Sequence, residues 1–181
     1  MINLTVTNSS DTAPTASNIA GLTGNLTLAA NTIIENAIGG SGDDIVNGNE
    51  YSNDLDGGDG DDHLYGGDGN DELRGGNGDD WLRGEIGNDK LYASYGDDWY
   101  LGGEGVDYLY VERSESINLN LTSVYGNMSG LGDAKVKDIE VFVFGSGSDQ
   151  AVGSSSNDTF YGNNGNDILH GKNGDDNLQG G

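Results

Sequence analysis

The sequence predicts an all-β fold, a parallel β-roll wound from short repeats in two blocks. From Gly39 onward the chain repeats with a period of nine residues. Glycine begins most of the units, and the eighth position of every unit is apolar or aromatic. Each unit divides into a six-residue turn and a three-residue strand, and because side chains alternate along a strand, only the middle strand residue points inward. The eighth-position residues therefore form a narrow core between two sheets.

The repeats form two blocks with a non-repeating stretch on the N-terminal side of each. The first block covers residues 39–110 and includes the units GGDGDDHLY and GGNGDDWLR. The second block covers residues 144–181 and stops partway through a unit, which we interpret as a cut within a repeat. We expect residues 1–38, a leading segment, and residues 111–143, an inter-block segment, to be strands and loops that continue the same stack.

Two columns of the repeat hold one kind of residue almost throughout the twelve full units. The sixth position is acidic in all but one unit, where Asn53 stands, and its residues are Asp44, Asp62, Asp71, Asp80, Asp89, Asp98, Asp107, Asp149, Asp158, Asp167 and Asp176. The eighth position holds Val46, Leu55, Leu64, Leu73, Leu82, Leu91, Tyr100, Leu109, Ala151, Phe160, Leu169 and Leu178. Random low-complexity sequence would not keep such columns in phase.

The composition leaves a stability problem that apolar burial does not solve. Only 33% of the residues are hydrophobic, and 31 acidic residues against 7 Lys and Arg give a formal net charge of −24. A compact chain with this charge repels itself unless cations neutralise it, and nucleic acid is a poor partner for it. The chain has no cysteine, so disulfides and thiolate metal sites are excluded. A metal held by oxygen ligands remains.

The turns have the residues that such a metal needs. Glycine at the first, second and fourth positions lets a turn adopt positive φ and brings backbone carbonyls together. Asn49 and Asn163 are mild departures at the second position, whereas Glu85 and Lys172 are strained there. With the sixth-position side chains, the candidate ligands are the backbones of Gly40, Gly42, Gly58, Gly60, Gly67, Gly69, Gly76, Gly78, Gly87, Gly96, Gly103, Gly105, Gly145, Gly147, Gly165 and Gly174.

This donor set favours calcium. Successive turns alternate between the two edges of a roll, so units n and n+2 stack at about 4.8 Å and bring two carboxylates and several carbonyls together. Six or more oxygens in a flexible cage suit Ca²⁺ better than Mg²⁺. Pairing n with n+2 predicts about eight ions, with sites weakened at Tyr51, Asn53 and Lys172. Because the sites do not exist in an extended chain, calcium binding and folding are expected to be coupled.

The units resemble the hemolysin-type calcium-binding repeats, the RTX family, whose consensus G-G-x-G-x-D-x-U-x is matched by GGDGDDHLY and GGNGDDWLR. Residues 21–46 are similar to the segment that precedes the β-roll of serralysin-type secreted metalloproteases. The motif INL at Ile2 and Ile117, and the pairs Ile34-Glu35 and Ile139-Glu140, suggest two modules. The resemblance implies a secreted, extracellular bacterial protein with a further attached domain, exported by type I secretion and folded by calcium outside the cell.

Catalytic interpretations find no support in the sequence. The two histidines, His63 and His170, lie at outward strand positions, and no HExxH motif surrounds either. The stretch from Asp56 to Asp62 lacks the spacing of an EF-hand loop. The outward positions show no threonine ladder of the kind found in ice-binding rolls. We therefore expect no enzyme activity, and no apolar run long enough to span a membrane is present.

One alternative function remains, a glycan- or protein-binding module. Alternating turns place Ile45, His63, Trp81 and Trp99 on the outward face of one sheet, beside a second row that contains Tyr65, Arg83 and Leu101. Such an aromatic stripe on an acidic body suits a polysaccharide or a partner protein. The structural alternative is that exposed strands favour aromatic residues for cross-strand packing.

Overall fold

The computed structural model describes residues 17–18, 25–27 and 36–181, and every regular element in these residues is a β-strand. One sheet contains, in spatial order, β1 (Ser17–Asn18), β3 (Asn36–Ser41), β5 (Asp54–Asp59), β7 (Glu72–Asn77), β9 (Lys90–Tyr92), β11 (Tyr108–Tyr110), β15 (Val141–Val143), β17 (Thr159–Tyr161) and β19 (Asn177–Gln179). The other contains β18 (Ile168–His170), β16 (Gln150–Val152), β12 (Asn118–Asn120), β13 (Gly126–Ser129), β14 (Asp133–Lys137), β10 (Trp99–Glu104), β8 (Trp81–Ile86), β6 (His63–Asp68), β4 (Ile45–Asn49) and β2 (Asn25–Thr27). Below, they are called the first and the second sheet.

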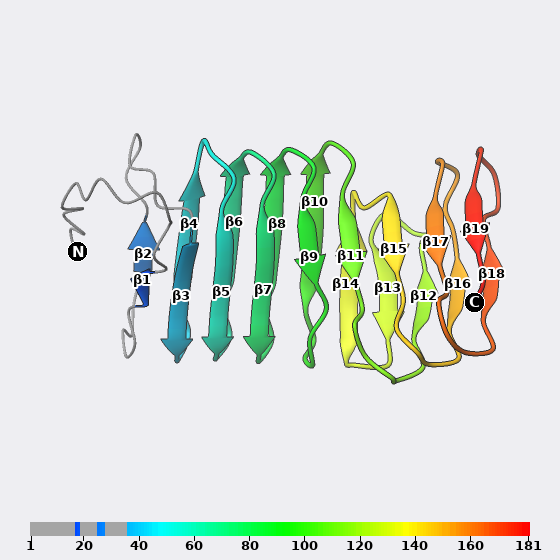
Figure 1. Ribbon diagram of the computed structural model, residues 1–181, viewed down its shortest axis with the longest axis horizontal. Coiled ribbons are helices and arrows are strands. Elements are labelled where there is room, and N and C mark those ends of the chain that lie inside the picture. Colours follow the sequence, from blue (N-terminus) through cyan, green and yellow to red (C-terminus); the bar gives the residue numbers. More distant parts are fainter. Residues whose placement is uncertain (1–16, 19–24, 28–35) are drawn as a thin grey trace.

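The two sheets form a parallel roll, as the nine-residue period predicts. Consecutive units alternate between the sheets, so strands two units apart are neighbours, and His63 pairs in register with Trp81, which pairs with Trp99. Figure 1 shows the strands stacked along the long axis, from β1 and β2 at one end to β18 and β19 at the other. The predicted fold class is confirmed.

The eighth-position side chains form the core between the sheets. From Val46 to Leu109 in the first block, all eight are fully buried, as are Ala151 and Phe160 in the second. The last two, Leu169 and Leu178, lie at the end of the stack and are less covered. Since each unit adds only about one apolar side chain, the core is one residue wide and cannot by itself offset the charge of the turns.

The strands of the first block are longer than predicted. β5, β6, β7, β8 and β10 each have six residues rather than three. The ladder continues past the eighth and ninth positions into the glycine pair, because Gly58 pairs in register with Gly76. The second-position glycines keep the backbones aligned there, so the turn is shorter than six residues.

The inter-block segment continues the stack, but not only with parallel strands. β13 pairs antiparallel with both β12 and β14, so β12, β13 and β14 form a meander within the second sheet (Figure 1). β14 and β12 are parallel to β10 and β16 respectively, and this meander joins the two blocks on that face. Residues 128–138, which we expected to be strands and loops with the rest of this segment, contain the end of β13 and all of β14.

Two predicted features lie outside the described residues, the INL motif at Ile2 and the pair Ile34-Glu35. In the described part of the chain, no helix is long and apolar enough to cross a membrane.

Candidate calcium-binding turns

The sixth-position side chains lie in two rows, one along each edge of the roll where the turns stack. Ten of the twelve are buried, with exposed fractions of 0–3%, and Asp167 and Asp176 near the end of the stack are partly buried. Carboxylates this buried require compensation, because removing a charge from water costs several kcal/mol. The hydrogen-bond partners of each carboxylate oxygen therefore show how its charge is compensated.

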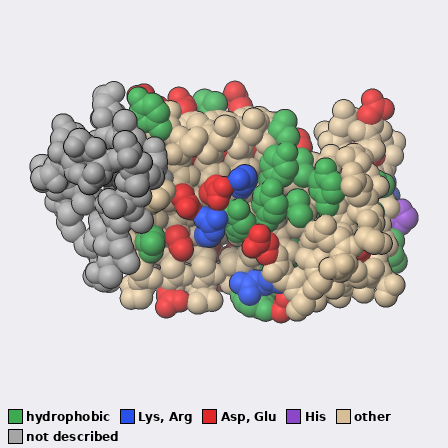
Figure 2. Space-filling model, in the orientation of Figure 1, with side chains coloured by type: hydrophobic (Ala, Val, Ile, Leu, Met, Phe, Trp, Pro, Cys, Tyr) green, Lys and Arg blue, Asp and Glu red, His purple; other side chains and the backbone are tan. Residues whose placement is uncertain are grey.

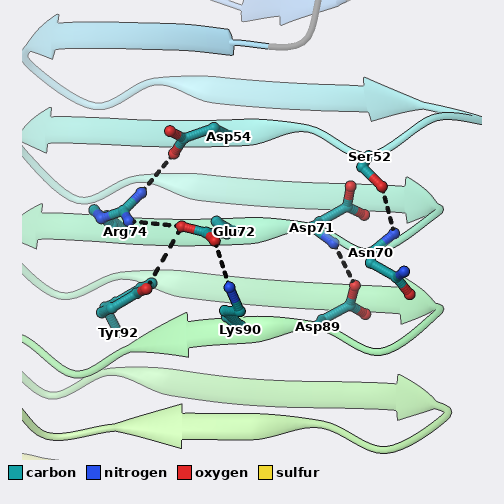
Figure 3. Close-up of polar contacts among 9 residues, drawn as sticks. All are labelled: Ser52, Asp54, Asn70, Asp71, Glu72, Arg74, Asp89, Lys90 and Tyr92. Atoms are coloured by element: carbon teal, nitrogen blue, oxygen red, sulfur yellow. Dashed lines mark hydrogen bonds and ion pairs between the residues drawn. The ribbon is translucent and has the colours of Figure 1, made fainter.

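One oxygen of nearly every one of these carboxylates accepts a hydrogen bond from within the protein. The backbone N–H of Asp71 donates to Oδ1 of Asp89 at 2.8 Å, a contact drawn in Figure 3. The same bond joins Asp44 to Asp62 and Asp62 to Asp80, at 2.7 and 2.9 Å. It recurs in the second block. Each of these turns is thus tied by its own carboxylate to the preceding turn on the same edge, which fixes the position of the second oxygen.

The second oxygen, Oδ2, has no hydrogen-bond partner at many of these positions. It is fully buried and unpartnered in Asp62, Asp71, Asp80, Asp89, Asp107, Asp149 and Asp167. A row of buried, unpartnered carboxylate oxygens is rare in proteins, where buried polar atoms are nearly always satisfied. It indicates a positively charged ligand that the turns are built to hold.

Main-chain carbonyls converge on the same places. A β-carbon built on Gly84 would meet both Oδ2 of Asp89 and the carbonyl oxygen of Gly102, which belongs to the turn stacked above. Gly66 repeats the arrangement with Asp71 and Gly84. Oxygens from two stacked turns therefore converge beside first-position glycines such as Gly66 and Gly84. This explains why glycine fills that position in ten of the twelve units.

Burial changes the protonation of these groups. Desolvation raises the pKa of Asp62 to about 6, and those of Asp71, Asp80 and Asp107 to about 7. Neighbouring carboxylates raise these pKa values further, whereas the backbone hydrogen bonds oppose the shift. Without a cation the turns retain protons near neutral pH, so calcium and protons compete for them.

The donor set fits calcium and does not resemble a site made by side chains alone. In the residues described, no three His, Cys, Asp or Glu side chains are grouped closely enough to hold a metal ion. A site between two stacked turns would instead combine carboxylate with main-chain carbonyl oxygens. That mixture of hard oxygen donors is what Ca²⁺ accepts at a coordination number of six to eight.

Three turns satisfy the sixth-position side chain internally. The buried hydroxyl of Tyr100 donates to Oδ2 of Asp98 at 2.6 Å, and Ser94 Oγ donates to the same atom at 3.1 Å. The backbone N–H of Ser154 donates to Oδ2 of Asp158 at 2.7 Å. In the third, Asn53 Oδ1 accepts the N–H of Asn49 at 2.9 Å. These turns have replaced glycine at the second position, as the sequence shows.

The positive φ predicted for the glycines is found at the second and fourth positions and not at the first. At the second position Gly58 has φ 107°, and at the fourth position Gly60 has φ 123°. Glu85 and Lys172 have φ 81° and 80°, so both residues have the left-handed backbone conformation that is strained for any residue but glycine and that glycine adopts in the other units. The first-position glycines do not have positive φ; they are required because Oδ2 and a carbonyl leave no space.

The remaining predicted glycines follow the same division, with one exception. Gly145 and Gly147 begin the second block without positive φ, because their turn stacks on residues 113–116, which are not a repeat unit. The others adopt positive φ as predicted: Gly40, Gly42, Gly67, Gly69, Gly76, Gly78, Gly87, Gly96, Gly103, Gly105, Gly165 and Gly174.

The repeat pattern did not predict the role of the fifth position. Its side chain accepts a hydrogen bond from the backbone of the next turn on the same edge, as Ser52 does from Asn70 (Figure 3) and Asp61 from Asp79 at 2.9 Å. The signal was present, because this position is Asp, Asn or Ser in every unit except the one with Val106. Fifth- and sixth-position side chains together tie each turn to both neighbours.

The aromatic stripe is assembled as predicted, but its rings face one another. Trp81 and Trp99 stack with centroids 5.0 Å apart and an interplanar angle of 4°, and His63 covers the other face of Trp81 at 6.0 Å. Tyr125 packs edge-on against Trp99 at 5.4 Å. Tyr65 and Arg83 pair in the adjacent row. Ring faces covered by neighbouring rings are unavailable for stacking on a sugar, and the geometry matches cross-strand packing.

The outward face of the first sheet is an ion-pair network. Glu72 accepts hydrogen bonds from Arg74 at 2.9 Å and Lys90 at 2.7 Å, and Arg74 also contacts Asp54 and lies 4.2 Å from the ring centroid of Tyr92. Figure 3 shows this network over β5, β7 and β9, and Figure 2 shows hydrophobic side chains gathered beside it over β11 and β15.

The comparisons with known proteins agree with this geometry. The family described as the RTX calcium-binding nonapeptide repeat matches residues 38–73, 74–109 and 145–178, more than half of the chain. No curated protein matches the chain. The matched residues contain the row of buried carboxylates on both edges and end where the repeats end.

Proposed function

The chain belongs to the RTX calcium-binding nonapeptide repeat family, and we propose that it is a module of a larger exported protein that folds when calcium binds. Its calcium-binding character follows from the repeats. We propose in addition that calcium binding is coupled to folding, that the protein is extracellular, and that a further domain is attached. The repeats of this family are structural rather than catalytic, and we assign the chain no enzyme activity.

The observation that carries the proposal is the row of buried Oδ2 atoms without partners. Calcium, when bound, supplies positive charge to these atoms. The residues of the chain hold the turns in place: the sixth-position Oδ1 atoms accept hydrogen bonds from the stacked turns, and the glycines leave room for the main-chain carbonyls. With about eight ions, about sixteen negative charges are neutralised, against a net charge of −24. The remaining charge is of an ordinary size for a soluble domain.

The energetics support a coupling between binding and folding. At calcium tenfold above a site's dissociation constant, each ion stabilises the folded state by about 1.4 kcal/mol, so eight ions contribute roughly 11 kcal/mol. This equals the whole stability of a typical domain. A core one residue wide with self-repelling turns is not expected to remain folded without it. These energies are consistent with export from the low-calcium cytosol as an unfolded chain, followed by folding outside the cell.

Circular dichroism during a calcium titration tests the proposal, with magnesium as the control. We expect a cooperative gain of strand signal in calcium and none at the same magnesium concentration, because Mg²⁺ requires a tighter octahedral site. A chain that is already folded in excess chelator at neutral pH, or that responds equally to magnesium, contradicts it.

A further inference from the structure

The two edges of the roll differ at the point where the first repeat block ends. The last first-block turns contain Asp98 on one edge and Asp107 on the other, and both side chains are fully buried. On its own edge, neither is followed by another nonapeptide, because the strands that stack next, β14 and β15, belong to the inter-block segment. What this segment offers to each carboxylate is therefore independent of the repeat pattern.

At Asp98, the inter-block segment offers no carboxylate. The register of β10 with β14 pairs Trp99 with Lys135, which places Ala134 opposite Asp98. Correspondingly, the Oδ2 atom of Asp98 accepts hydrogen bonds from Tyr100 and Ser94. At this end of the edge, the protein caps the carboxylate of Asp98 with its own hydroxyl groups.

At Asp107, the inter-block segment offers Glu140. The register of β11 with β15 pairs Tyr108 with Val141, which places Glu140 opposite Asp107. The N–H of Asp107 donates to Glu140 Oε2 at 2.9 Å. This is the bond that the N–H of each preceding turn on this edge makes to a sixth-position carboxylate, such as Asp89 to Asp107 at 2.8 Å.

The other oxygens of a repeat site are also present. Oδ2 of Asp107 is fully buried and has no hydrogen-bond partner. A β-carbon on Gly102 would meet this atom and the carbonyl oxygen of Asp138, just as a β-carbon on Gly84 would meet Asp89 and the carbonyl of Gly102. Asp138 has φ 52°, whereas the first-position glycines, whose carbonyl it replaces here, do not have positive φ.

We infer that Glu140 is a calcium ligand outside the nonapeptides, and that with Asp107 and the carbonyl of Asp138 it forms a calcium site joining the first block to the inter-block segment. The inference depends on the proposed function, since it adds one site to the same ladder. Burial raises the pKa of Glu140 and that of Asp107, as it does for the carboxylates of the repeats. The site makes the stacking on this edge continuous across residues that lack the nine-residue period.

Glu140→Gln tests the inference, because Gln keeps the acceptor for the N–H of Asp107 and removes the charge. Calcium per chain is measured by equilibrium dialysis at saturating calcium on variants shown by circular dichroism to be folded. We expect Glu140→Gln to bind one ion fewer than the wild-type chain. Glu112→Gln, the same change at an exposed position of the inter-block segment, is expected to bind the wild-type number.

The outcomes separate the inference from the proposed function. A wild-type chain that binds no calcium overturns both. A wild-type chain that binds calcium, with Glu140→Gln binding the same number, overturns only the role of Glu140. If Glu140→Gln does not fold, Glu140→Asp retains the charge with a shorter reach, and we expect one ion to bind at least tenfold more weakly. A binding curve equal to that of the wild type would then refute the site.

Discussion

Replacing Asp89 with Asn separates a calcium ligand from a structural hydrogen-bond acceptor. Asp89 lies in the middle of its edge, where its Oδ1 accepts the N–H of Asp71 and its own N–H donates to Asp107. Asn has the same size and keeps an oxygen for the first bond. It places an amide where the buried, unpartnered Oδ2 lies, so the ions on both sides of this turn each lose a carboxylate.

The expected loss can be estimated from the number of ions. Two sites share Asp89, and at calcium tenfold above their dissociation constant each contributes about 1.4 kcal/mol, so the variant should lose about 3 kcal/mol of stability. The assay is urea denaturation at several fixed calcium concentrations. The slope of the unfolding free energy against the logarithm of free calcium counts the ions released on unfolding, and it should fall by two.

Asp79→Asn is the matched control. It makes the same charge change at an exposed fifth-position residue whose Oδ1 accepts the N–H of Asp97 at 2.9 Å, and its slope should equal that of the wild type. If Asp89→Asn loses stability with an unchanged slope, Asp89 acts only through hydrogen bonds. The assignment of the sixth-position carboxylates as ligands would then be wrong.

Three further predictions concern strain, capping and protonation. Glu85→Gly should stabilise the calcium-loaded chain by up to about 1 kcal/mol, because φ 81° is strained for Glu and open to Gly; an unchanged urea midpoint would refute this. Tyr100→Phe removes the hydroxyl that caps the buried Asp98 and should cost about 2 kcal/mol with no change in the calcium slope, whereas a lower slope would show that this turn holds an ion. In chelator, stability should fall as pH rises from about 4 to about 7, because the folded chain keeps protons on Asp71 and Asp80, whose pKa values are about 7 against 3.8 for an unperturbed Asp. Circular dichroism between pH 4 and pH 8 checks the last, and a fold lost toward acid would contradict it.

The repeat pattern predicted the parts of the molecule that repeat. Leucine at the eighth position and aspartate at the sixth each have one place in a two-sheet roll, so Leu82 in the core and Asp80 at the edge followed from the period alone. The period predicted the alternation of units between the sheets and the outward stripe through Trp81. It did not predict that the Trp rings would cover each other's faces, because side-chain torsions are not set by spacing.

What the sequence could not show lies where the period is absent. The meander of β12, β13 and β14 has no repeat to predict it, and the period gives no sign of its antiparallel pairs. Glu140 is a similar case: the Ile139-Glu140 pair was visible as a motif, yet its register opposite Asp107 follows from the pairing of β11 with β15. A ligand supplied from outside the repeats therefore requires the structure.

The ends of the ladder show most directly why the turns require a cation. If buried carboxylates were tolerated in this fold without compensation, the protein would have no reason to cap Asp98 with the hydroxyls of Tyr100 and Ser94. That cap occurs where the next turn provides Ala134 instead of an acid, whereas Asp62 and Asp80, which each face another acid, retain an unpartnered Oδ2. The buried Oδ2 atoms are thus either capped by the protein, as in Asp98 and Asp158, or left without a partner, as in Asp62 and Asp80. The unpartnered atoms are those that an ion shared between two turns would compensate.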